Sequence, residues 1–160
     1  MDAIIYTKSR QEYEMLSRIL EHELPGVMIS QGIMDGSFNL EHEYGIAVVG
    51  VNGALGMELV CKYRELYGST LVIWITDDSY FAGVAIRTRI FDFIVRPFEE
   101  TRFREAVRRI EEGDIAVWQR MAVKNPVHQT GCAWEENVPK RRDRTIWKKI
   151  RDYFLSESAL

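Results

Sequence analysis

The chain has 160 residues, of which 46% are hydrophobic and 28% are charged, and its formal net charge is −3. These values are typical of a globular domain with a buried core, and they exclude a disordered or collagen-like chain. No apolar run approaches the roughly 18 residues that a membrane-spanning helix requires, and the N-terminal residues have neither the basic nor the apolar region of a signal peptide.

The first half of the chain predicts three buried strands and two helices. Continuous apolar runs predict strands over Ala3–Tyr6, Val27–Gln31 and Ile46–Val51. Ser9-Arg10-Gln11-Glu12 has the spacing of a capping box, in which Ser9 and Glu12 each accept a backbone N–H of the other, so a helix is expected to begin there. A second helical stripe follows Asn52-Gly53, and the polar residues 35–43 predict a loop with at most a short helix.

The second half continues the alternation. Strands are predicted over Thr70–Thr76 and Phe93–Val95, with a weaker helix over 80–90 whose residues Phe81, Ala85, Ile86 and Ile90 are expected to face inward. A further helix is expected to begin after Glu99-Glu100, where acidic residues suit the positive end of the helix dipole.

Short apolar strands that alternate with helices predict a five-stranded, parallel, doubly wound α/β sandwich of the flavodoxin-like type. In such a fold the functional site lies at the carboxyl ends of the strands. The residues expected at this edge are Thr7, Lys8, Gly50, Val51, Thr76, Asp77, Arg96 and Pro97.

Two segments carry a resemblance to a known family. Residues 74–86 (WITDDSYFAGVAI) and residues 92–98 (DFIVRPF) resemble the receiver domain of two-component response regulators, and are most similar to receivers with a LytTR-type output domain. The resemblance covers residues 1–113 and implies the receiver fold. It also implies a Thr or Ser after the fourth strand, here Thr76, and a proline after the fifth strand, here Pro97, whose peptide bond is cis in the family.

The family's phosphoryl-transfer residues are largely replaced. The resemblance implies an acidic pair that holds Mg²⁺, and these positions carry Thr7 and Lys8. The phosphoacceptor aspartate falls on Gly50, or on Val48 if the following loop is not shortened, and the conserved lysine is replaced by Arg96. Mg²⁺ requires oxygen ligands and a lysine cation does not supply them, so we expect a pseudo-receiver with no metal, no cofactor and no enzymatic activity.

Three alternatives stay open at this edge of the sheet. Asp77 and Asp78 could supply a shifted acidic pair. Lys8, Thr76 and Arg96 could bind an anion, since two cations converge there. The interpretation that we favour is an internal pairing of Lys8 or Arg96 with Asp77 or Asp78.

A surface of mixed charge is expected on the last three elements of the receiver-like part, namely the fourth helix, the fifth strand and the fifth helix. In the family this surface is used to dimerise, and here the residues expected on it include Arg87, Arg89, Asp92, Arg102, Arg108 and Arg109. Opposite charges suit salt bridges between subunits, although a solvated face is an equal alternative.

The C-terminal part divides into a helix and linker, 114–139, and a basic amphipathic segment, 140–160. The net charge is −7 over residues 1–138 and +4 over residues 139–160. Apolar and basic residues fall on opposite sides of a predicted helix. This segment could dock on its own acidic domain, bind a protein or nucleic acid, or stay solvated, and its candidate binding residues are Lys140, Arg141, Arg142, Arg144, Trp147, Lys148, Lys149 and Arg151.

The function expected from these features is that of an atypical response regulator. It would act without phosphorylation, by contact with a protein partner or a second copy, in two-component signalling or transcription control. The alternative is a small transcriptional regulator that binds nucleic acid through residues 140–151. Two cysteines, Cys61 and Cys132, make no disulfide framework, so a reducing cytoplasm is expected.

Overall fold

The computed structural model describes residues 1–34, 38 and 40–113. Five parallel strands form one sheet in the order β2-β1-β3-β4-β5, as predicted for a doubly wound fold. The order reverses between β1 and β3, which is where such folds place their sites. The strands span Asp2–Thr7 (β1), Met28–Gln31 (β2), Ile46–Gly50 (β3), Leu71–Thr76 (β4) and Asp92–Val95 (β5).

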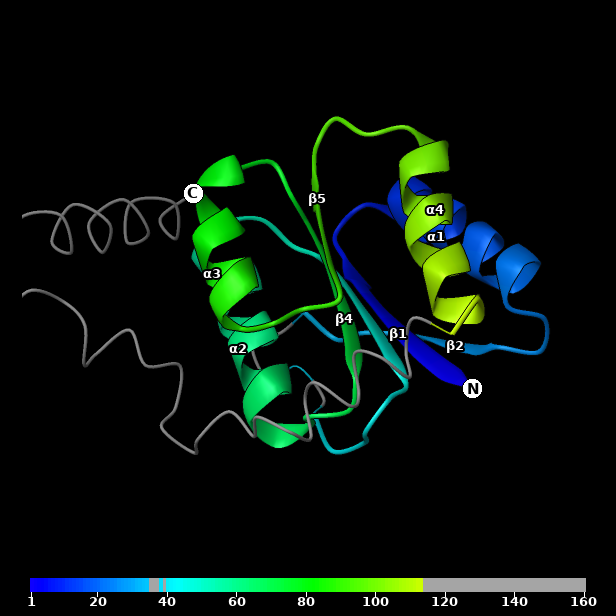
Figure 1. Ribbon diagram of the computed structural model, residues 1–160, viewed down its shortest axis with the longest axis horizontal. Helices are drawn as coiled ribbons and strands as arrows, with labels where there is room; N and C mark the ends of the chain where they lie inside the picture. Colours follow the sequence, from blue (N-terminus) through cyan, green and yellow to red (C-terminus); the bar gives the residue numbers. More distant parts are fainter. Residues whose placement is uncertain (35–37, 39, 114–160) are drawn as a thin grey trace, which may run out of the picture.

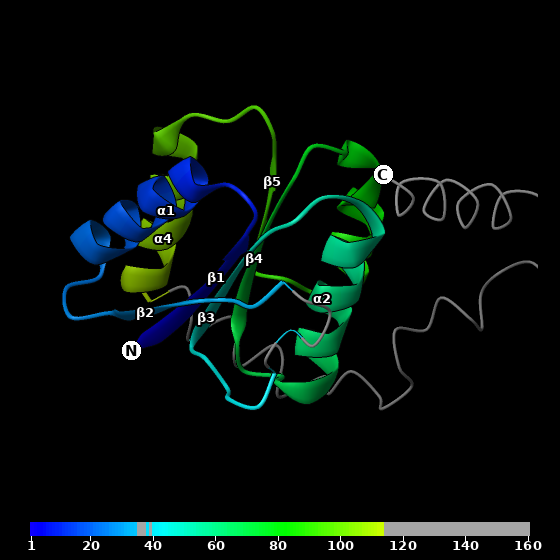
Figure 2. The same ribbon diagram turned by 180° about the vertical axis from the view of Figure 1, so that it is seen from behind.

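Helices cover both faces of the sheet. Figure 1 shows α1 and α4 side by side on one face, with α2 and α3 on the other, and Figure 2 shows the same two layers from behind. A 3-10 turn, η1, precedes α3. The bounds are Arg10–Glu23 (α1), Gly53–Leu66 (α2), Ser79–Phe81 (η1), Ala82–Arg87 (α3) and Glu100–Glu111 (α4).

The three central strands, β1, β3 and β4, are almost continuously apolar because helices cover both of their faces. In β1, Ala3 and Ile5 pack beneath α1 and α4, whereas Ile4 and Tyr6 pack on the α2 side, and all four are fully buried. The same alternation continues in β3 and β4. The continuous apolar runs in the sequence therefore reflect two helical layers, as expected.

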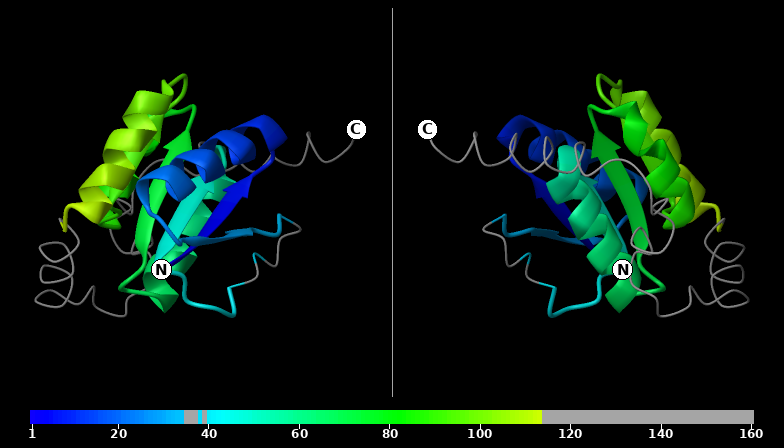
Figure 3. Two further views of the ribbon diagram at one scale, coloured as in Figure 1. Left: turned by 90° about the vertical axis from the view of Figure 1, so that its right-hand side faces the viewer. Right: turned by 90° about the vertical axis from the view of Figure 1, so that its left-hand side faces the viewer.

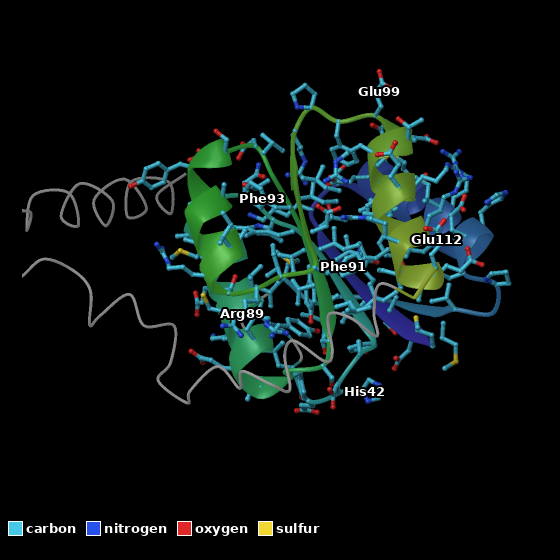
Figure 4. All side chains as sticks on the ribbon, viewed as in Figure 1. His42, Arg89, Phe91, Phe93, Glu99 and Glu112 are labelled. Atoms are coloured by element: carbon cyan, nitrogen blue, oxygen red, sulfur yellow. The ribbon has the colours of Figure 1, made fainter. Side chains whose placement is uncertain are left out.

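Trp74, in the middle of β4, is the largest fully buried side chain on the α2 side. Its ring lies 5.3 Å from that of Phe81 and 5.6 Å from that of Phe93, measured between centroids. Its indole Nε1 donates a hydrogen bond to the carbonyl of Val51 at 3.2 Å. Figure 4 shows Phe93 on the side of the sheet that carries α3, so β4, β5 and η1 share one aromatic cluster.

The predicted helix over 80–90 is wrong in extent. Only η1 and the six-residue α3 form there, and η1 is capped by Asp78, whose carboxylate accepts the Tyr80 N–H at 2.8 Å. Ala85 is buried and Phe81 and Ile90 pack partly against the core, but Ile86 is 76% exposed, so its predicted inward orientation is wrong. So short a helix has room for only a narrow buried stripe.

The described residues of the connection from β2 to β3 form no helix, as Figure 3 shows. Buried Phe38 holds it, since the Tyr6 hydroxyl donates to the Phe38 carbonyl at 2.8 Å. The hydroxyls of Tyr6 and Tyr63 lie 2.9 Å apart. Burial raises the pKa of both tyrosines, so this pair stays neutral.

Candidate functional site

Four strand ends meet at one edge of the sheet. Thr7 ends β1 and lies opposite Gly50 at the end of β3, and Thr76 ends β4. The backbone N–H of Arg96, just after β5, donates to the Thr76 carbonyl at 2.7 Å. The loop from β5 to α4 crosses this edge at the top of Figure 1. The structure therefore brings together four of the residues predicted to form the site.

The Arg96 guanidinium joins four elements at this edge. Its Nη2 lies 2.6 Å and 2.8 Å from the two carboxylate oxygens of Glu12, and its Nε lies 3.1 Å from Oε1. The same side chain donates to the carbonyls of Gly50 and Ile75 and to Oδ1 of Asn52, the last at 2.6 Å. Its side chain is 23% exposed and that of Glu12 is 12% exposed, so this is a largely desolvated ion pair.

Glu12 reaches the strand ends from the first turn of α1. Half of the predicted capping box is confirmed, because Ser9 Oγ accepts the Glu12 N–H at 3.2 Å. The other half is wrong, since the Glu12 carboxylate does not accept a hydrogen bond from the Ser9 N–H. Instead, Thr7 Oγ1 donates to Glu12 Oε2 at 2.6 Å and itself accepts the Ser9 N–H at 3.2 Å. The carboxylate is thereby directed toward Arg96.

Gly50 leaves the space that the Glu12 carboxylate uses. A Cβ atom at Gly50 would lie 3.3 Å from Glu12 Oε2, 3.3 Å from Thr7 Cβ and 3.1 Å from the Tyr6 carbonyl oxygen. Those contacts are tight, so a side chain here would have to displace the carboxylate or the β1 backbone. The position where the resemblance places a phosphoacceptor is thus packed against an acid from α1.

The acidic pair after β4 has local partners. Asn52 Nδ2 donates to Asp77 Oδ2 at 2.9 Å, and the Asp77 N–H donates to Asn52 Oδ1 at 3.2 Å. Asp78 caps η1. The pairing predicted for Arg96 with Asp77 or Asp78 is therefore wrong, because its carboxylate partner is Glu12. Lys8 is exposed, and the part of the chain that the structure describes holds no cluster of His, Cys, Asp or Glu suited to a metal ion.

One further expectation has a structural outcome, since the Arg96–Pro97 peptide bond is cis, as the resemblance implies. The expected cytoplasmic location stays a prediction.

Several residues of the predicted dimer surface are used inside the molecule. Asp92 of β5 is 10% exposed and accepts from Arg102 at 2.7 Å and 2.9 Å, and also from Arg109. Arg108 donates to Glu23 of α1 at 2.9 Å. These pairs fix α4 to the sheet and to α1, so intersubunit bridges are not needed to explain their charges. Arg87 and Arg89 are exposed.

Glu23 of α1 is an acid that joins this helix to α4. Its side chain is 7% exposed and lies 2.9 Å from Arg108 and 2.5 Å from Arg104. Arg108 first, and then Arg104, lower the pKa of Glu23 to about 2. A depressed pKa stabilises the fold above the ordinary value of 4.5, and that contribution is lost as the pH falls toward 2.

We therefore expect the wild-type chain to lose more unfolding free energy between pH 4.5 and pH 2 than Glu23→Gln does. Urea midpoints measured across this range check the difference. Glu14→Gln is the matched control, because Glu14 pairs with Arg10 on the exposed side of α1. Identical pH profiles for the wild-type and Glu23→Gln chains would contradict this role of Glu23.

The predicted helix and linker, 114–139, and the basic segment, 140–160, lie outside the described residues, so the binding residues expected there stay predictions. Within the described residues, no helix is both long and apolar enough to cross a membrane.

Comparison with solved structures identifies the fold. The chain is similar to the response regulatory domain of mrkE from Klebsiella pneumoniae, with 17% identity, a TM-score of 0.61 and coverage of 75% of this chain and 99% of that domain. It is similar to HP1043, an orphan response regulator of H. pylori, with 20% identity, a TM-score of 0.56 and coverage of 70% and 94%. A third structure, of an atypical orphan response regulator, gives 20% identity, a TM-score of 0.56 and coverage of 70% and 93%.

The chain has the receiver fold. No family model and no curated protein matches the sequence. The sequence-based prediction of a receiver-like domain is therefore confirmed at the level of fold, while the LytTR subgroup stays a prediction.

Proposed function

We propose that the chain is a receiver-like signalling module that works without phosphoryl transfer and acts through contact with a protein partner. The observation that carries the proposal is the Glu12 carboxylate, which lies against Gly50 and is paired with Arg96 at 2.6 Å and 2.8 Å. An internal ion pair thus fills the edge where a receiver would bind its metal and accept its phosphoryl group.

The chemistry of phosphoryl transfer supports this interpretation. A carboxylate attacks an anionic phosphoryl group only when a metal ion and a cation neutralise the developing charge. Here the cation, Arg96, is already bound to Glu12, and Thr7 and Lys8 offer no carboxylate for Mg²⁺. The residues present therefore do not fit the metal that a working receiver uses.

Two of the similar structures are of response regulators described as orphan, and one description refers to a phosphorylation-independent regulatory mechanism. A phosphorylation-independent regulatory mechanism is thus described for one of these proteins. By analogy, we propose a role for this chain in two-component signalling or transcription control, as a binding module and not as an enzyme.

The proposal predicts that phosphodonors leave the protein unchanged. Incubation with acetyl phosphate and Mg²⁺ should leave the intact mass unaltered, because no strand end carries an acceptor beside a metal site. A receiver domain with its acceptor aspartate, treated in parallel, is the positive control. A phosphoryl adduct that Asp77→Asn or Asp78→Asn removes would overturn the proposal and would establish the shifted acidic pair.

A further inference from the structure

The two edges of the sheet differ in how they are protected. Edge strands of soluble proteins usually carry charges or proline, because unpaired N–H and C=O groups otherwise invite another strand. The β5 edge begins at ion-paired Asp92 and is followed by Arg96 and Pro97. Within β2, Met28–Gln31, there is neither a charge nor a proline. Residues 24–34 contain no charged side chain, in a chain that is 28% charged.

The outward backbone groups of β2 are unpaired. The Met28 N–H donates to the Met1 carbonyl at 3.1 Å, and the Gly32 N–H donates to the Ile5 carbonyl at 2.8 Å, so these residues face β1. Because alternate residues of a strand direct their polar groups to opposite sides, Ile29 and Gln31 direct theirs away from the sheet. Neither has a backbone partner on that side within the described residues.

Apolar side chains accompany this open edge. Met28 is 69% exposed, Met1 beside it is 60% exposed, and Ile33, just after the other end of the strand, is 46% exposed. Ile29 packs partly against the core beneath α1 and α4, whereas the connection that follows β2 has no helix within its described residues. An apolar, uncharged strand edge is typical of a surface that pairs with another strand.

We propose that β2 pairs antiparallel with β2 of a second copy of this chain, across a two-fold axis at Ser30. The edge is self-complementary in this arrangement, because Ile29 lies opposite Gln31 of the second copy and each such pair exchanges two N–H···O=C bonds. Met28 then lies opposite Gly32 of the second copy, where no side chain opposes it. The absence of charge along the edge suits an identical neighbour, since like charges opposite each other would repel.

Substitutions that place a positive or a negative charge at Ser30 test the proposed pairing of β2 with β2 of a second copy. Sedimentation equilibrium of the full chain should give a mass that rises with concentration from 18.7 kDa toward twice that value. Ser30→Lys and Ser30→Glu should each raise the dimer dissociation constant at least tenfold, since like charges then face each other across the axis. An equimolar mixture of the two variants should dimerise again, because the charges are then opposite.

The controls separate this interface from other surfaces. Ser79→Lys and Ser79→Glu change an exposed serine of η1 and should leave the dimer unaffected. If either Ser30 variant unfolds, Gln31→Pro removes an outward donor without removing a bond to β1, and it should abolish dimerisation. A chain that stays monomeric, or Ser30 variants that dimerise normally, would overturn the proposal. So would protection of the Ile29 and Gln31 amides from exchange in a monomer, which would indicate that another part of the chain covers the edge.

Discussion

Arg96→Met should destabilise the fold by about 3 kcal/mol, because it leaves the Glu12 carboxylate desolvated and without its cation. Removing one partner of a buried ion pair costs ~3–5 kcal/mol, and the low end applies since Arg96 is 23% exposed. Two strand-end carbonyls, those of Gly50 and Ile75, also lose their donor. Chemical denaturation at neutral pH, followed by far-ultraviolet circular dichroism, measures the change.

A double-mutant cycle isolates the contribution of the ion pair. Glu12→Gln combined with Arg96→Met should be less destabilising than the sum of the single changes, because no unpaired charge then remains. Arg10→Met is the matched control: Arg10 pairs with Glu14 in the same helix, but their side chains are 91% and 61% exposed, so its loss should destabilise the fold far less than the loss of Arg96. If Arg96→Met costs no more than Arg10→Met, the network at the strand ends does not stabilise the fold.

Gly50→Asp should restore the family's acceptor residue in sequence without restoring its chemistry. The new side chain would begin 3.3 Å from Glu12 Oε2 and 3.1 Å from the Tyr6 carbonyl, so it adds overpacking and places two carboxylates together. We expect destabilisation of about 3 kcal/mol, which combines the ~1–3 kcal/mol of overpacking with like-charge repulsion. Denaturation and an intact-mass assay with a phosphodonor measure both outcomes.

Two related variants separate size from charge at this position. Gly50→Ala adds only the Cβ and should cost about 1 kcal/mol, the low end of overpacking. Gly50→Asp with Glu12→Gln removes the repulsion and should recover much of the stability lost in Gly50→Asp. Two results would contradict our inference that the Glu12–Arg96 ion pair fills the space beside Gly50. One is a Gly50→Asp variant as stable as the wild-type chain, and the other is a Gly50→Asp variant that accepts a phosphoryl group with Glu12 in place.

The strands of this fold could be predicted from the sequence because burial on both faces leaves continuous apolar runs. Ile46–Gly50 and Leu71–Thr76 differ from the predicted bounds by a single residue at one end. The helix that follows β4 was harder to predict, since residues 80–90 hold enough apolar side chains for a full stripe. Only the packing of the sheet decides that Ala85 is buried and Ile86 is not.

The strand ends of the site could be predicted, but the contacts of Arg96 could not. Parallel topology places Thr7, Gly50, Thr76 and Arg96 at one edge, and this follows from the order of the elements alone. The role of Glu12 was missed because its spacing from Ser9 fits a capping box equally well. The available signal was chemical, since an arginine near the strand ends favours a carboxylate partner and Glu12 lies in the first turn of the helix that follows Thr7.

The salt bridges of α4 illustrate a second feature that could not be predicted from the sequence. Arginines and acids that alternate on a helix predict a charged surface without indicating which charges face the protein. Arg108 and Arg102 contact Glu23 and Asp92, which are 85 and 10 residues away in sequence. Such pairs depend on how α4 lies against α1 and β5, and a single sequence does not contain that geometry.

The buried position of Trp74 allows binding to be followed by intrinsic tryptophan fluorescence. Among the described residues Trp74 is the sole tryptophan, and its indole contacts Phe81 of η1 and Phe93 of β5. A ligand that displaces η1 or β5 would change the polarity around the indole, and with it the wavelength and intensity of the emitted light. Screening for binders can therefore begin with unlabelled protein in a fluorimeter, once the emission of the three tryptophans beyond residue 113 is accounted for.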